Sequence, residues 1–153
     1  MMTERISFVE LDSKLFDGMN RTEMYLKKSG LDLKLLELIK YRVSQINGCA
    51  FCLDMHHKEA IHMGESELRL HSLAAWKECP FYDEKERAAL AFAETLTLAA
   101  RQEAGDEVFD ELARHFSKQE IASLTLAVTQ INAWNRINKA FGTIPGAYQV
   151  GQY

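Results

Sequence analysis

The chain has 153 residues, of which 47% are hydrophobic and 26% charged, and its net charge is −4. A chain of that length can bury roughly 70% of its unfolded surface, so we expect one domain over residues 1–153 without stabilising crosslinks. The negative charge repels phosphate backbones and thus argues against nucleic acid as a partner.

The sequence predicts neither a membrane-spanning helix nor a signal peptide. No apolar run approaches the roughly 20 residues of a membrane-spanning helix, so no membrane partner is expected. The run MMTERISFVELDSK is acidic and lacks the apolar stretch of a signal peptide. These observations predict a cytoplasmic protein. In such a reducing compartment, a close cysteine pair is more often catalytic, redox-active or metal-binding than structural.

Helical periodicity along the first half of the chain, without strand-like alternation, predicts four helices. We expect the first over 10–28, followed by Gly30, which can adopt the left-handed conformation of a helix cap. Its apolar residues at helical spacing are Leu11, Leu15, Met19 and Leu26. The next three helices are expected at about 32–45, 49–64 and 65–76, with Asn47-Gly48 separating the first two.

The second half predicts three more helices, at about 83–101, 106–115 and 117–142. Asp83 pairs with Glu86 in a plausible cap, and Ser117 with Glu120 forms the capping-box pattern. We therefore expect the chain to form a single all-α bundle of six to seven helices. The wide apolar arcs of AALAFAETLTLAA and IASLTLAVTQINAW fit either the bundle centre or an oligomer interface.

The stretch NGCAFCLDMHHKEA carries the clearest chemical signal. Cys49, Cys52 and His56 are spaced i, i+3 and i+7, so a helix starting at Cys49 places all three on one face. Unpaired N–H groups at a helix start favour a thiolate, and two cysteines three apart can form a disulfide. A thiolate near a base and a second thiol can react with peroxide.

A metal site is the alternative reading of the same residues. Zinc normally requires four ligands, and His57, His62 and Cys79 supply no second ligand pair at a recognisable spacing. Cys49, Cys52 and His56 could still hold a metal with an open fourth position. Two merely buried thiols are a weaker reading, because charged residues crowd the segment.

The run ELIKYRVSQINGCAFCLDMHHKEA, residues 37–60, resembles the carboxymuconolactone decarboxylase family, in particular its alkylhydroperoxidase (AhpD-like) branch. The pattern of that branch is a glutamate, a C-x-x-C pair twelve residues on, and then a histidine. This chain matches it at Glu37, Cys49, Cys52 and His56. The later runs EKERAALAFAETLT and INAWNRINKAF are also similar to the family.

The resemblance implies an all-helical homo-oligomer, a trimer or hexamer, that reduces hydrogen peroxide or organic hydroperoxides in antioxidant defence. It implies that Cys52 attacks the peroxide, Cys49 resolves the product, and His56 transfers the proton with Glu37 behind it. An external dithiol or disulfide reductase would supply electrons, and no cofactor or metal is expected. The alternatives are a disulfide reductase or adaptor with a low peroxidase rate, and a non-catalytic metal-binding oligomer.

Glu37 illustrates what the resemblance adds to the pattern. On a helical wheel it falls with Tyr41 and Ser44, opposite the apolar stripe, which by itself indicates a solvated glutamate. With the resemblance, this polar face becomes a wall of the site and Tyr41 a possible neighbour. A partly buried Glu37 beside His56 is expected to have a raised pKa, which suits a proton relay.

The remaining candidates have weaker signals. The best-known family members carry a second histidine between the cysteines, where this chain has Phe51. His57 and His62 are predicted to be solvated, Cys79 to be a free loop thiol, and Trp134 to be core. The two asparagines inside the last predicted helix, Asn132 and Asn135, are left open.

Overall fold

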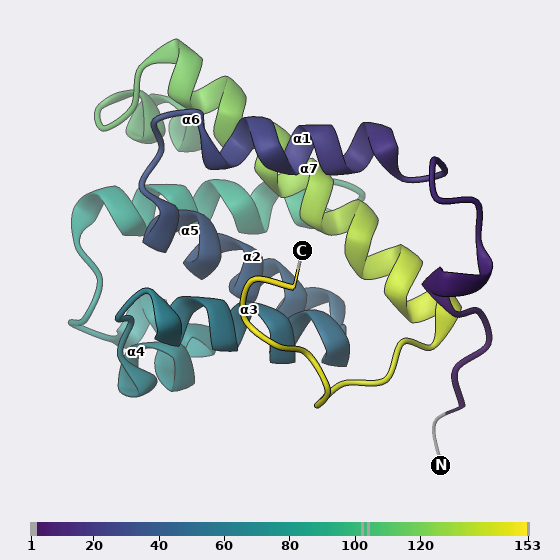
Figure 1. Cartoon of the computed structure of the whole chain (residues 1–153). Helices are drawn as coiled ribbons and strands as arrows, with labels where there is room; N and C mark the ends of the chain where they lie inside the picture. The colour runs from purple at the N-terminus through teal and green to yellow at the C-terminus, as the bar shows by residue number, and fades with distance from the viewer. Residues whose placement is uncertain (1–2, 102, 104, 153) are drawn as a thin grey trace.

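Figure 1 shows the computed structural model, which describes residues 3–101, 103 and 105–152. These residues form helices and, within the ranges just given, no strand, so the predicted all-α fold is confirmed. In chain order the elements are η1 (Phe8–Glu10), α1 (Asp17–Lys27), α2 (Leu33–Asn47), α3 (Ala50–His62), α4 (Glu67–Ser72), η2 (Leu73–Glu78), α5 (Glu84–Thr97), α6 (Asp106–Ala113) and α7 (Lys118–Phe141).

Helix α2 lies at the centre and packs against α3, α5 and α7. Its apolar stripe, which includes Leu35, Ile39 and Val43, is buried against side chains such as Ala93 on α5 and Leu124 on α7. The outer helix α1 crosses α7 (Figure 1). The centre of the bundle is therefore the α2–α5–α7 contact, and α3, which carries the cysteines, packs directly on it.

The predicted helix starts and ends in the second half are confirmed where a cap fixes them. The side chain of Asp83 accepts the Glu86 N–H at 2.8 Å, and Ser117 accepts the Glu120 N–H at 3.2 Å. Helix α7 ends at Gly142, whose φ of +70° is the left-handed conformation expected of a C-cap glycine.

The predicted first helix begins too early. Residues 8–10 form the 3-10 helix η1, and α1 starts only at Asp17. Leu15, assigned to the apolar stripe, is 59% exposed. The segment instead packs two aromatic rings on α7: Phe8 lies 5.1 Å from Phe141, and Phe16 lies 5.5 Å from Trp134, between ring centroids. These contacts outweigh the local helical pattern.

The fourth and fifth predicted helices are also shorter than expected. The span 65–76 divides into α4 and the 3-10 helix η2, with a non-helical backbone at Ala75 (φ −116°, ψ 31°). This break accompanies the burial of Trp76, whose indole N–H donates to Glu94 on α5 at 2.8 Å. Helix α5 ends at Thr97 instead of residue 101.

Candidate functional site

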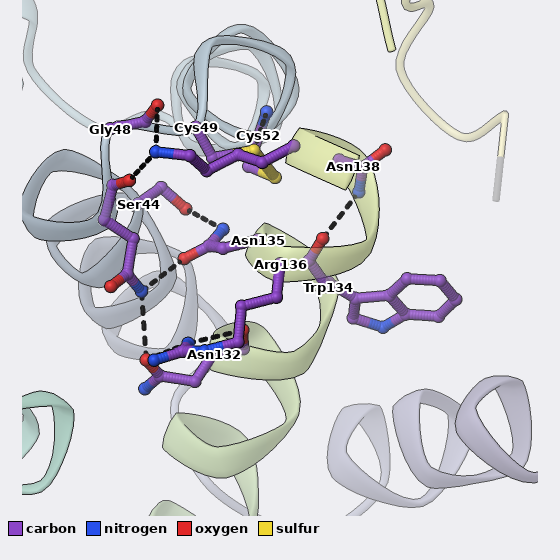
Figure 2. Close-up of a disulfide and its surroundings, with 11 residues drawn as sticks. Ser44, Gly48, Cys49, Cys52, Asn132, Trp134, Asn135, Arg136 and Asn138 are labelled. Carbon is purple, nitrogen blue, oxygen red and sulfur yellow. Dashed lines mark hydrogen bonds between the residues drawn. A yellow bond between two sulfur atoms is a disulfide. The ribbon is translucent and has the colours of Figure 1, made fainter. Parts of the chain in front are cut away.

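The cysteine pair lies at the turn between α2 and α3. Gly48 ends α2 with a left-handed backbone (φ +62°), and Cys49 is the N-cap of α3. Cys49 and Cys52 form a disulfide with 5.3 Å between their Cα atoms, and both are buried (Figure 2). Because Cys52 is the third residue of α3, it lies in the first turn, where unpaired N–H groups stabilise negative charge.

An amide network anchors this turn to α7 (Figure 2). The side-chain NH₂ of Asn47 donates to the side-chain oxygens of Asn132 and Asn135, each at 2.9 Å. Asn135, fully buried, donates in turn to Ser44 Oγ at 3.0 Å. Lys139 donates to the Asn47 carbonyl at 2.7 Å. Asn132 and Asn135, for which the sequence predicted no role, thus hold the end of α2 and the adjoining Cys49 in place.

Glu37 and His56 form a buried pair between α2 and α3. Glu37 Oε2 lies 2.7 Å from His56 Nδ1, and the two residues are 7% and 5% exposed. This contact occupies Nδ1 and leaves Nε2 as the ring nitrogen available for proton exchange. Cys52 precedes His56 by four residues on the same helix, so the thiol and the imidazole share one face.

The expectation of a raised pKa at Glu37 is wrong. Burial by itself raises the pKa of this carboxyl group. The charge and hydrogen bond of His56, followed by those of Lys40, outweigh burial and lower the pKa to about 2. Glu37 is therefore a carboxylate at neutral pH. It acts as a fixed negative partner for the imidazole, since it does not itself hold the proton.

Lys40 extends the pair into a longer chain of charges. Its ammonium group lies 3.5 Å from Glu37 Oε1 and 3.1 Å from Glu23 Oε2 on α1. The other oxygen of Glu23 accepts the indole N–H of Trp134 on α7 at 3.1 Å. Side chains from four helices, α1, α2, α3 and α7, are therefore linked through hydrogen bonds and ion pairs.

Cys52, His56, Glu37 and Lys40 all line a single cavity of about 530 Å³. Cys49 is not among its lining residues, so only one of the two sulfurs belongs to a residue facing this space. Much of the remaining wall is apolar or aromatic and includes Phe8, Phe16, Met55, Ile131 and Trp134. A cavity of this size and lining suits a small organic molecule.

The C-terminal tail, residues 143–152, runs along α3 (Figure 1). Lys58 donates to the carbonyl oxygens of Gly146 and Tyr148 at 3.2 and 3.1 Å. Tyr148 is 2% exposed, lines the cavity, and meets the ring of Phe51 edge-on at 6.5 Å. Phe51, which lies between the two cysteines in the sequence, is thus part of an aromatic wall of the cavity.

Three of the other predicted candidates, Tyr41, His57 and Cys79, do not line this cavity. The ring of Tyr41 lies 6.2 Å from that of His57, and Tyr41 is not a lining residue. His57 is instead bound to Glu67 at 2.9 Å. Cys79 is a free, half-buried thiol at the end of η2. Trp134, predicted as core, packs partly against the core and also reaches the cavity.

Sequence reasoning missed Glu23 and Lys40. Lys40 follows Glu37 by three residues, which is the spacing of an ordinary surface ion pair on a helix. Its only sequence signal is the apolar residues on both sides, and they do not reveal that Glu23 on α1 binds it.

Within the described residues, no group of three or more His, Cys, Asp or Glu side chains is arranged to hold a metal ion. None of the helices described is both long and apolar enough to span a membrane.

Known proteins are similar to this chain in sequence and in fold. The model of the carboxymuconolactone decarboxylase family matches residues 13–95. The uncharacterized protein YdfG of Bacillus subtilis (strain 168) is 43% identical over 141 residues, which cover 92% of this chain and 96% of that protein.

Two solved structures have the same fold. One, from Agrobacterium tumefaciens, is a protein of unknown function provisionally assigned to antioxidant defence as an AhpD. It is 40% identical, with a TM-score of 0.91 over 95% of this chain and all of that one. The other is a peroxidase-related protein from Silicibacter sp. TM1040, 24% identical, with a TM-score of 0.80 over 92% of this chain and 75% of that one.

Proposed function

Because this chain belongs to the carboxymuconolactone decarboxylase family, we propose that it is an AhpD-like thiol peroxidase. It reduces hydrogen peroxide or organic hydroperoxides at Cys52. One observation carries the proposal: of the two disulfide-forming cysteines, Cys52 alone lines the cavity, and it shares that cavity with His56 and Glu37.

The reaction begins with the reduced pair. Nε2 of His56 takes the proton of the Cys52 thiol, and the thiolate attacks one peroxide oxygen. The S–O bond forms as the O–O bond breaks. The leaving alkoxide or hydroxide takes the proton from His56 and departs as an alcohol or water. Cys52 is then a sulfenic acid, oxidised by two electrons, and the peroxide has been reduced by two.

Cys49 completes the cycle. Its sulfur attacks the sulfenic sulfur, the S–O bond breaks, and water leaves with the Cys49 proton, which gives the Cys49–Cys52 disulfide. An external dithiol then donates two electrons and two protons to restore both thiols. This requirement favours the cytoplasm, where dithiol reductants are maintained. A homo-oligomer, trimer or hexamer, is proposed from the family resemblance alone.

The direct test is a thiol count with peptide mapping after one equivalent of an organic hydroperoxide. We expect the reduced protein to change from three free thiols to one, with a Cys49–Cys52 bond, a free Cys79 and one equivalent of alcohol. Three free thiols at the end, or Cys79 in the main disulfide, would contradict the proposal.

Single variants separate the roles of the cysteines. Cys52→Ser should lose peroxide consumption, whereas Cys49→Ser should retain a sulfenic acid at Cys52 that a carbon nucleophile can trap. Cys79→Ser is the matched control and should turn over at the wild-type rate. Disulfide exchange with a dithiol, combined with a peroxide reaction no faster than that of free cysteine, would instead identify a disulfide reductase or adaptor.

A further inference from the structure

Lys40 is a buried lysine that lines the same cavity as Cys52 and has no part in the proposed reaction. Lys40 is 5% exposed, and its ammonium group lies between Glu23 at 3.1 Å and Glu37 at 3.5 Å. Burying an ammonium group is unfavourable unless opposite charges surround it. Burial lowers the pKa of Lys40, but Glu37 and Glu23 raise it above its usual value, so the group stays charged.

The charges around Cys52 show what this cation balances. The titratable side chains that share the cavity with Cys52 are Glu23 and Lys27 from α1, Glu37 and Lys40 from α2, His56 and Glu59 from α3, and Tyr148 from the tail. Lys27 is exposed to solvent, and the Tyr148 hydroxyl is bound to Glu59. Of the described lining residues, Lys40 is thus the buried one with permanent positive charge.

Two carboxylates, Glu23 and Glu37, lie on either side of Lys40, and Glu59 lines the same cavity. Forming a thiolate at Cys52 adds a further negative charge to this cavity. Without the ammonium group, these charges oppose one another in surroundings of low dielectric constant, where their repulsion acts over longer distances than in water. With the ammonium group present, Glu37 stays ionised and holds His56 by Nδ1. The positive charge of Lys40 also offsets the negative charge of the thiolate that forms at Cys52.

We propose that Lys40, held by Glu23, is a positioning residue that sets the charge of the Glu37–His56 pair and thereby the ease with which Cys52 becomes a thiolate. This inference rests on the proposed role of Cys52 as the reactive thiol. It does not require that peroxide be the oxidant. A purely structural ion pair predicts something different, because then removal of either partner would have the same kind of effect.

The test measures the rate of alkylation of Cys52 by iodoacetamide as a function of pH, in a Cys49→Ser background. Lys40→Met removes a positive charge and should raise the midpoint of the thiolate titration by about one pH unit, which slows alkylation about tenfold below the midpoint. Glu23→Gln removes a negative charge and should lower the midpoint. The double variant should return toward the starting midpoint.

Lys77→Met is the matched control, because Lys77 is 68% exposed, so its loss should leave the midpoint unchanged. Midpoints that move in the same direction in folded Lys40→Met and Glu23→Gln, or that do not move, would overturn the proposal. If Lys40→Met does not fold, Glu23→Gln decides alone: a lowered midpoint supports the role, and an unchanged or raised one overturns it. Since alkylation consumes no peroxide, this result is independent of peroxidase activity.

Discussion

Replacing Glu37 by glutamine should make the stability of the protein less dependent on acid pH. The substitution keeps the shape of the side chain and its place between His56 and Lys40, but removes the negative charge that both of them contact. The native wild-type protein has the same charge at this position as the variant when Glu37 is protonated. The two proteins should therefore differ most at neutral pH and least in acid.

The pKa of Glu37 sets the magnitude. Burial raises it, but His56 and Lys40 lower it from its usual 4.5 to about 2. A tenfold change in proton affinity is worth about 1.4 kcal/mol, so the ionised carboxylate stabilises the fold by roughly 3 kcal/mol. Because the native pKa is below the unfolded one, this stabilisation is complete above the unfolded value and is lost as pH falls toward the native one. About 2 kcal/mol should disappear between about pH 5 and pH 3.

The assay is urea denaturation of the oxidised wild-type and Glu37→Gln proteins at a series of pH values. The other carboxyl groups with a lowered pKa, Asp54, Glu94 and Glu120, are present in both proteins and cancel in the difference. Glu4→Gln, at an exposed position, should follow the wild-type curve. A difference between wild type and Glu37→Gln that stays constant over this range would refute the buried ion pair.

Three further predictions concern His56, Gly142 and Gly18. His56→Ala should slow the reaction of Cys52 with peroxide by about 10²- to 10⁴-fold in stopped-flow measurements, the usual range for a lost general base, whereas His57→Ala, whose imidazole faces Glu67, should react almost normally. Gly142→Ala should lower the free energy of unfolding by about 1–3 kcal/mol, because the new Cβ would lie 2.8 Å from the Thr3 carbonyl oxygen at a φ of +70°. Gly18→Ala, in α1 with open space around it, should raise it by about 0.5–1 kcal/mol in the same urea titration.

Local signals predicted the helices well where side chains near in sequence fix their ends. Asp83, Ser117 and Gly142 act within one turn of themselves, so their effect can be read without knowing the fold. The cysteine turn was predicted for the same reason, since Gly48 ends α2 and Cys49 caps α3. The predicted start of the first helix was wrong, because Phe8 and Phe16 contact side chains more than a hundred residues away in the sequence.

The site shows the same division. Spacing along the chain was enough to single out Cys49, Cys52 and His56. Glu37 was added by the family resemblance, because periodicity alone placed it on a solvated face. In the structure Glu37 is buried, and its carboxylate contacts His56 on α3 and Lys40, which is itself bound to Glu23 on α1. The role of Tyr41 as a site neighbour gains no support, because its ring lies beside His57 outside the cavity.

The all-helical fold, the caps and the disulfide-capable turn could be predicted without the structure, because each depends on residues within a few positions of one another. The distribution of charge and space around Cys52 could not, because it depends on how separate helices pack. Burial raises the pKa of Glu37, but His56 and then Lys40 outweigh it, and Lys40 is buried with Glu23 of another helix as its partner. Whether the pKa of Glu37 rises or falls depends on distances between helices. Residue spacing along one helix does not give those distances.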